Sequence, residues 1–266
     1  MLIVAERINT SRRAIAEAVA AGNAEFIQQE ARAQAQAGAD YIDVNAGTFL
    51  EQEAAKLAWI VEAVQAATDL PLSLDSASPD VLESVLPKVR RPPMINSVTL
   101  EPARLNRILP LALEAKARLI ALCQSGQGLA DTATTKAAVA DQLVEAIAAA
   151  GFPIEDLYID PLVFPLATNT ASALETLKAI ETIHRRHPAA HTICGLTNVS
   201  YGLPARKLVN RTFLTAAVLH GLDAVILDPT DARLAGALRA ALLVAGQDEY
   251  CLRFIKGFKK GLFDPS

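Results

Sequence analysis

Polar side chains capable of chemistry follow short apolar runs at eight places along the chain. The set consists of Glu6, Asp43, Asp75, Asn96, Cys123, Asp160, Asn198 and Asp228. A carboxylate accepts two hydrogen bonds at once, whereas an asparagine amide both donates and accepts. Such a set suits a flat, nitrogen-rich heterocycle, because an amino-pyrimidinone ring presents adjacent N–H donors that a carboxylate matches in bidentate fashion.

Each of these residues stands where a β-type run gives way to a helical stretch, and this alternation predicts the elements that position them. The eight runs are Leu2–Val4, Tyr41–Val44, Pro71–Leu74, Met94–Ile95, Leu119–Leu122, Leu157–Ile159, Thr192–Cys194 and Ala224–Leu227. Eight βα units close a (β/α)₈ TIM barrel, whose chemistry lies where its strands end. The length of 266 residues suits one such barrel, so we expect a single α/β domain over residues 1–266.

Helix-capping signals separate the β-type runs. Asn23 is expected to cap a helix that runs through Gln36, and Ser78 one that begins at Pro79. Further helices are predicted from Glu101-Pro102, over 131–150, 169–187 and 206–220, and from Asp231 onward. The tail over about 250–266 is amphipathic and basic, which favours a barrel-capping helix over a membrane or partner anchor.

Composition and charge exclude several classes of function. The formal net charge of -4 and the pI near 5.6 give no reason to expect a nucleic-acid partner. No apolar run approaches the roughly 18 residues of a membrane span, and the first residues lack a basic leader, so we expect a cytoplasmic protein with no membrane partner. The three cysteines are far apart, which favours buried thiols over a disulfide framework or a zinc site.

The sequence also argues against a bound metal and a phosphate ligand. The histidines fall at predicted helix ends or in a bottom-side loop, at His184, His187, His191 and His220. A histidine base or metal site at the strand ends is therefore not expected, and no metal is assigned. A glycine-rich loop leading into a helix, which usually holds phosphate, is missing, and no Lys or Arg directly follows the seventh or eighth run.

Simpler explanations exist for each position alone. An aspartate after a strand is often a helix cap or a turn former. Asp75 begins the sequence Asp-Ser-Ala-Ser-Pro and Asp228 begins Asp-Pro-Thr-Asp, and both sequences are typical of turns and caps. Glu6 and Arg7 can form a structural ion pair at the barrel mouth, and Asn9 and the Asn45-Ala46-Gly47 segment can form turns. The functional interpretation therefore depends on the set as a whole.

Six short motifs in order along the chain resemble the pterin-binding methyltransferase family. They are Glu6-Arg7-Ile8-Asn9, Asp43-Val44-Asn45-Ala46-Gly47, Asp75-Ser76, Asn96-Ser97, Asp160-Pro161-Leu162 and Asn198-Val199-Ser200. The resemblance is greatest to the methyltetrahydrofolate:corrinoid protein methyltransferases, and the chain is also similar to the folate domain of cobalamin-dependent methionine synthase. It implies a (β/α)₈ barrel that takes tetrahydrofolate or methyltetrahydrofolate as substrate, with a corrinoid (cobalamin) carried by a partner protein, in one-carbon metabolism. It also implies a homodimer.

The resemblance assigns roles to individual residues. It implies that Asp75, Asn96 and Asp160 hold the pterin ring, and that Asn198 lies near the methyl-bearing nitrogen. Glu6 and Asn9 are implied to line the same area. Less certain members of the site are Asp43, Asn45, Ser200 and Arg206. Asn198 is the expected catalytic amide, because it can meet a neutral or a protonated nitrogen by rotating, and Glu6 is expected to tune the local field.

One departure from the family pattern and two alternative functions stay open. Some acetogen members carry Gln directly after Asn-Val-Ser, where this chain has Tyr201, a version that looks more like enzymes of methylotrophic corrinoid systems. A dihydropteroate synthase-like enzyme is the first alternative, although the Lys of the seventh strand and the Arg-His pair of the eighth that such enzymes show are not seen. A non-catalytic pterin-binding module is the second.

Overall fold

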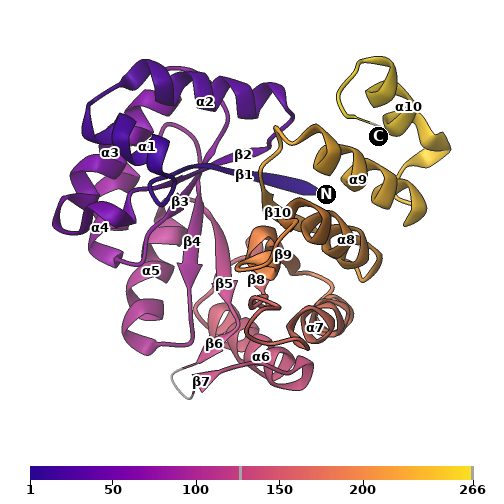
Figure 1. Ribbon diagram of the computed structural model, residues 1–266. Coiled ribbons are helices and arrows are strands. Elements are labelled where there is room, and N and C mark those ends of the chain that lie inside the picture. Colours follow the sequence, from indigo (N-terminus) through magenta and orange to yellow (C-terminus); the bar gives the residue numbers. More distant parts are fainter. Residues whose placement is uncertain (126–127, 265–266) are drawn as a thin grey trace.

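The computed structural model describes residues 1–125 and 128–264 and contains a closed barrel of eight parallel strands. These strands are β1 (Leu2–Asn9), β2 (Tyr41–Asn45), β3 (Leu72–Asp75), β4 (Met94–Val98), β5 (Arg118–Leu122), β8 (Leu157–Asp160), β9 (His191–Gly195) and β10 (Ala224–Leu227). Around the barrel they follow chain order, and β10 closes the circle by pairing with β1. The predicted single (β/α)₈ barrel is confirmed (Figure 1).

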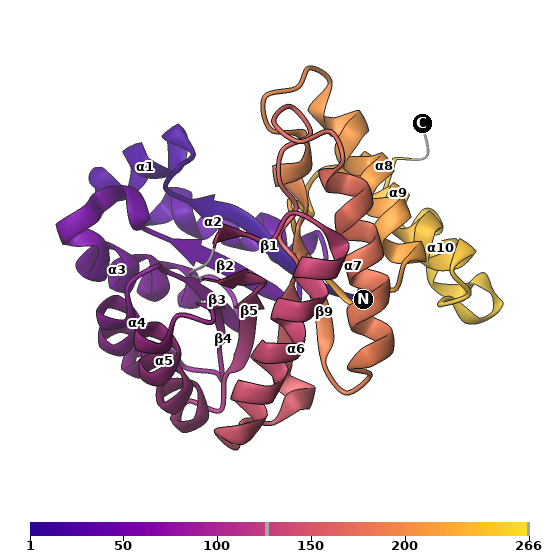
Figure 2. The ribbon, with the colours of Figure 1, turned by 90° about the horizontal axis from the view of Figure 1, so that it is seen from below.

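Helices surround the strands on the outside of the barrel (Figures 1 and 2). They are α1 (Arg13–Ala20), α2 (Ala24–Gln36), α3 (Glu53–Gln65), α4 (Pro79–Val85), α5 (Pro102–Glu114), α6 (Ala133–Ala149), α7 (Ser172–Arg186), α8 (Arg206–Leu219), α9 (Ala232–Val244) and α10 (Leu252–Lys259). The predicted caps are present, since Asn23 accepts a hydrogen bond from the backbone N–H of Phe26 and Asp231 accepts one from that of Leu234, both at 3.1 Å.

The first strand and the segment after the fifth strand differ from the sequence prediction. Strand β1 continues past Val4 to Asn9, with an irregularity in its pairing with β2 between Ala5 and Ile8, so Glu6 lies inside the strand and not beyond its end. A two-stranded antiparallel hairpin, β6 (Gln124–Ser125) and β7 (Gly128–Leu129), follows β5. Its strands are too short to produce a recognisable alternation of apolar and polar residues.

A layer of apolar side chains fills the barrel below its mouth. Its fully or largely buried members are Val4, Tyr41, Met94, Ile120, Tyr158, Ile193 and Ala224. Side chains along a strand alternate between its two faces, so a residue and the one two positions later point the same way. Two positions after four of these apolar residues, a polar side chain therefore points into the barrel one layer closer to the mouth. That higher layer contains Glu6, Asp43, Asn96 and Asp160. The apolar layer therefore forms the floor on which the polar residues at the mouth stand.

The C-terminal tail folds back onto the outside of the barrel. Figure 1 shows α10 beside α9 at the edge of the helical ring, and Phe263 is buried there against Phe254 and Phe258, with ring centroids 5.1 and 6.2 Å apart. Among the described residues, no helix combines the length and the apolar character that crossing a membrane requires.

Candidate active site

A cavity of about 230 Å³ lies at the carboxyl ends of the barrel strands. Its lining is formed by Glu6, Asn9, Asp43, Asp75, Asn96, Leu122, Asp160, Leu162, Gly195, Thr197, Asn198 and Ile226. The catalytic pair and the pterin-binding trio expected from the sequence thus share one space, together with Asn9 and Asp43. We refer to it as the inner cavity.

Four carboxyl groups of the inner cavity have raised pKa values. Burial raises the pKa of Asp75 and of Asp160 to about 6. Burial and the nearby carboxylate of Asp228 raise the pKa of Glu6 to about 7, and burial with the neighbouring Asp75 raises that of Asp43 well above its usual range. No Lys or Arg lines this space among the described residues, so no side-chain cation neutralises these acids from within the cavity.

Asn45 supports Asp75 and does not line the inner cavity. Its amide nitrogen donates to the Asp75 carboxylate at 3.0 Å and to the Asp75 carbonyl at 3.1 Å, while its own oxygen accepts from the backbone N–H of Gly47. The expected turn around Asn45 therefore exists and also fixes the orientation of Asp75. Asp43 accepts from the Ser73 hydroxyl at 2.7 Å, which holds it in the same layer.

Arg104, on α5, was not predicted as part of the site. Its guanidinium donates to the carbonyls of Ser97 at 2.8 Å, of Ser76 at 3.0 Å and of Ala77. It thereby ties the loop after β3 to strand β4, and it lines a second cavity of about 360 Å³ next to Asp75. An arginine in the first turn of a helix gives no sequence signal for this role, because it resembles any solvated helix residue.

The loop after β9, which contains the short 3₁₀ helix η4 (Leu196–Ser200), carries Asn198, whose side chain is exposed at the rim. Arg206 fixes this loop by donating to the Thr197 carbonyl at 2.9 Å and to the Ser200 hydroxyl at 3.1 Å. Ser200, which was predicted as a less certain site residue, is fully buried and does not line the inner cavity. A Cβ atom at Gly195 would lie 3.2 Å from the Asn198 amide nitrogen, so glycine leaves that amide room to turn.

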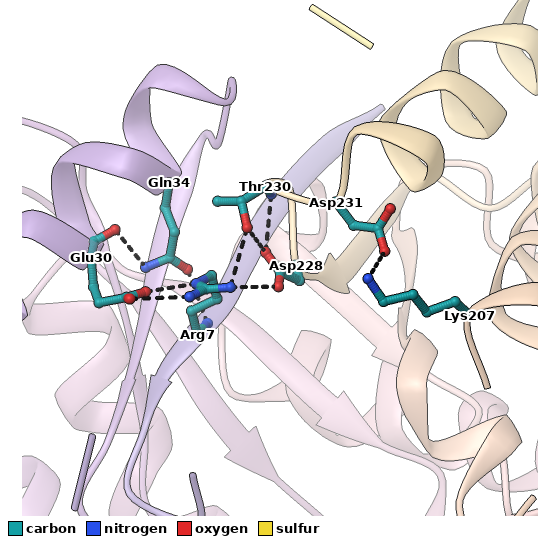
Figure 3. A network of polar contacts seen from close by, with 7 residues as sticks. All are labelled: Arg7, Glu30, Gln34, Lys207, Asp228, Thr230 and Asp231. Carbon is teal, nitrogen blue, oxygen red and sulfur yellow. Dashed lines mark hydrogen bonds and ion pairs between the residues drawn. The ribbon is translucent and has the colours of Figure 1, made fainter. Parts of the chain in front are cut away.

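The eighth rim residue, Asp228, belongs to a structural network (Figure 3). Arg7 donates to Asp228 at 2.9 Å and forms a two-point pair with Glu30 at 2.6 and 3.0 Å. Asp228 also accepts from the Thr230 hydroxyl at 2.6 Å. Asp228 thus forms the turn that the structural alternative describes, and Arg7 pairs with Glu30 and Asp228 instead of with Glu6.

A wider cavity of about 810 Å³ adjoins the inner cavity and opens to the surface. Glu6, Asn9, Thr197 and Asn198 line both spaces, so the boundary between them runs along these residues. Basic groups appear on the outer side, namely Arg12, Arg206 and Lys207. Tyr201 is 67% exposed beside Arg206 at the same rim.

Histidines and cysteines contribute nothing to these walls among the described residues. Cys123 and Cys194 are fully buried, and burial raises the pKa of both thiols. No group of three or more acidic, histidine or cysteine side chains within the described ranges has the arrangement of a metal site.

The fold and the site define a TIM barrel with a polar ligand cavity at the carboxyl ends of its strands. Comparison with known sequences identifies its family. Residues 5–228 match the family described as "Pterin binding enzyme". The chain belongs to this pterin-binding enzyme family.

Two individual proteins are similar to this chain over most or all of its length. The chain is 35% identical, over all of its own length and 98% of the relative's, to a methylcorrinoid:tetrahydrofolate methyltransferase of Eubacterium limosum. It is 29% identical to the methionine synthase of Mycobacterium tuberculosis over 85% of the chain, which is 20% of that much longer protein.

Solved structures share the fold. Dihydropteroate synthase of Xanthomonas albilineans with 4-aminobenzoic acid superimposes with a TM-score of 0.70 at 19% identity, covering 91% of this chain and 90% of that one. The Yersinia pestis dihydropteroate synthase gives 0.68 at 18% identity, over 92% and 93% of the two chains.

Proposed function

We propose that this protein is a methyltransferase that moves a methyl group between tetrahydrofolate and the cobalt of a corrinoid carried by a partner protein. The observation that carries the proposal is the inner cavity, where carboxylates and amides line a space closed below by apolar side chains. The full-length similarity to the Eubacterium limosum enzyme, whose name gives the reactants, supports it and favours tetrahydrofolate as the methyl acceptor.

The pterin ring of the folate fits the residues of the inner cavity. Asp75 and Asp160 as carboxylates accept hydrogen bonds from the ring N–H and amino groups, and the Asn96 amide meets a ring carbonyl. Asp43 and Asn9 complete the walls, whereas Asn45, Ser200 and Arg206 act by fixing Asp75 and the Asn198 loop. The methyl-bearing nitrogen then faces the boundary with the wider cavity, where Asn198 lies.

The difficult step is the change in charge at that nitrogen. In transfer to tetrahydrofolate, the unprotonated N5 attacks the methyl carbon, the cobalt–carbon bond breaks with its electron pair left on cobalt, and N5 then loses a proton. In reverse, N5 must gain a proton before the methyl departs. The Asn198 amide can accept from the N5 proton or donate to its lone pair, because its two ends differ and Gly195 leaves it room to turn.

Glu6 is the proton acceptor in this proposal. Its pKa of about 7 allows it to take a proton from N5 and to return it at neutral pH, and it lines both cavities beside Asn198. The Thr197 hydroxyl donates to Glu6 at 3.3 Å, which holds the carboxylate at the boundary. Glu6 thus has a direct chemical role in addition to its effect on the local field.

The remaining expectations concern the surroundings of the reaction. The open rim with exposed Asn198 and Tyr201 accommodates a partner protein that carries the corrinoid. Family resemblance supports a cytoplasmic homodimer that works in methylotrophic or acetogenic one-carbon metabolism, with residues 1–266 as one domain and about 250–266 as its tail.

Pteroate synthesis is the weaker alternative. The neighbours that suggest it are under 20% identical and support the shared fold alone. Such synthases also show a Lys on the seventh strand and an Arg-His pair at the eighth, and neither is seen around β9 or β10 of this chain.

Anaerobic mixing of the protein with methylcobalamin and tetrahydrofolate tests the proposal. The visible spectrum should develop the cob(I)alamin band, and methyltetrahydrofolate should form in equal amount. Cob(I)alamin mixed with methyltetrahydrofolate should give the reverse change. Tight folate binding without either change would support a non-catalytic pterin-binding module, and pteroate formation from p-aminobenzoate would support the synthase.

A further inference from the structure

Lys136 is a fully buried lysine directly behind the inner cavity. It lies on α6 and has 0% exposure, although lysine is almost never fully buried unless its charge is compensated. The proposed catalytic residues are Asn198 and Glu6, and Lys136 lines none of the cavities at the barrel mouth. Its burial therefore requires a separate explanation.

The Lys136 ammonium is hydrogen-bonded to the backbone that directly follows Asp160. Its Nζ donates to the carbonyl of Pro161 at 2.6 Å and to that of Leu162 at 2.5 Å, and it lies 4.6 Å from the centre of the Phe164 ring. Two hydrogen bonds and one cation–π contact therefore surround the ammonium. They lie on the segment that leads out of β8, at the residues next to Asp160.

This segment has a conformation that needs such support. Leu162 has a φ of 57°, in the left-handed region that a branched side chain rarely adopts. The same residue lines the inner cavity, and its N–H donates to the Asp160 carboxylate at 2.7 Å. Lys136 and Asp160 thus hold Leu162 from its two sides, the carbonyl and the N–H.

The titratable groups around Lys136 indicate that Asp160 is the carboxylate with which its charge interacts most. Those that face it are Asp160 on β8, Cys123 after β5, Cys194 on β9, Asp131 before α6 and Glu175 on α7. Glu175 is engaged by the backbone N–H of Ala133 at 2.7 Å and by Lys178 at 2.9 Å, and Asp131 is exposed. The two thiols are buried and uncharged, so the Lys136 charge acts chiefly on buried Asp160.

We propose that Lys136 is the positioning residue for Asp160, fixing the backbone after it and keeping its carboxylate charged to receive the pterin N–H groups. The assignment rests on the proposed function, because the pterin is what the charged carboxylate binds. Burial favours the neutral acid, whereas the backbone N–H groups of Leu162 and Gly195, and after them the Lys136 ammonium, favour the carboxylate.

The test measures the protonation of Asp160 directly. Carboxyl-carbon NMR of ¹³C-labelled aspartate follows the Asp160 signal, identified by its loss in Asp160→Asn, from pH 4.5 to 9. The wild type should show a midpoint near its pKa of about 6. Lys136→Gln retains two N–H donors for the carbonyls and removes the charge, so the midpoint should rise by about one pH unit.

Matched variants separate charge from structure. Lys259→Gln removes a lysine charge from the exposed face of α10, on the outside of the barrel, and should leave the midpoint unchanged. Lys136→Arg retains the charge and should keep the wild-type midpoint even where it destabilises the fold. An unmoved midpoint in Lys136→Gln overturns the proposal. If that variant does not fold, a midpoint about one unit higher in Lys136→Arg overturns it.

A parallel titration with methyltetrahydrofolate keeps the two proposals apart. Calorimetry should show that the loss of affinity on the acid side begins about one pH unit higher in Lys136→Gln than in the wild type. Affinity that is weaker by the same factor at every pH indicates a merely structural role and contradicts the proposal. Absent folate binding with a shifted Asp160 midpoint contradicts the pterin function and still supports the action of Lys136 on Asp160.

Discussion

Single side chains at the boundary of the two cavities carry the chemistry, and Asn198 tests this most simply. Asn198→Ala removes the amide that follows the changing charge on N5, so the rate of methyl transfer should fall about 100-fold. Folate affinity should change less than about fivefold, because one exposed hydrogen bond contributes about 1 kcal/mol to binding. Single-turnover rates and calorimetric Kd values check this. Equal losses in rate and affinity would assign Asn198 to binding.

Glu6 determines the pH dependence in this account. Its carboxylate form accepts the N5 proton, so transfer to tetrahydrofolate should speed up as pH rises through about 7, and the reverse reaction should slow over the same range. Glu6→Gln should flatten both profiles near neutrality, while Glu25→Gln, on the exposed face of α2, serves as the control. A midpoint near 7 that survives in Glu6→Gln would exclude Glu6 as the proton acceptor.

At the scale of elements, the Arg7 network joins α2, β1 and the end of β10 (Figure 3). Arg7→Met leaves the carboxylates of Glu30 and Asp228 without their cation, so the free energy of unfolding should fall by about 2 kcal/mol. Arg13→Met breaks an exposed pair with Glu17 and should cost less than about 0.5 kcal/mol. Urea denaturation measures both, and equal small losses would show that the network adds no stability.

The sequence predicts those parts of the fold and the site that depend on local patterns. Apolar runs place Asp75 and Asp160 at the last residues of their strands and Asn96 in the middle of β4, and the barrel brings them together. The bond between Arg7 and Asp228 joins residues 221 positions apart, so no local pattern contains it. Lys136 likewise reads as a solvated helix residue, because its burial depends on how α6 packs.

At the scale of the whole molecule, the raised carboxyl pKa values make the free protein more stable when mildly acidic. Groups whose folded pKa exceeds the unfolded value bind more protons in the folded state, so stability falls as pH rises through 6 and 7. The Tm should be about 5 °C higher at pH 5.5 than at pH 8. Differential scanning calorimetry checks this, and Glu6→Gln should reduce the difference. A Tm that rises with pH over this window would contradict the burial of these acids.

The central claim is that the barrel mouth holds the pterin by its nitrogen-bearing edge and presents N5 to a second reactant. A crystal structure of the protein with methyltetrahydrofolate tests it most directly. The ring edge should lie within hydrogen-bond distance of Asp75, Asn96 and Asp160, with the methyl group on the Asn198 side and facing the wider cavity. A pterin bound elsewhere, or one whose methyl group points toward the apolar floor of the barrel, would contradict it.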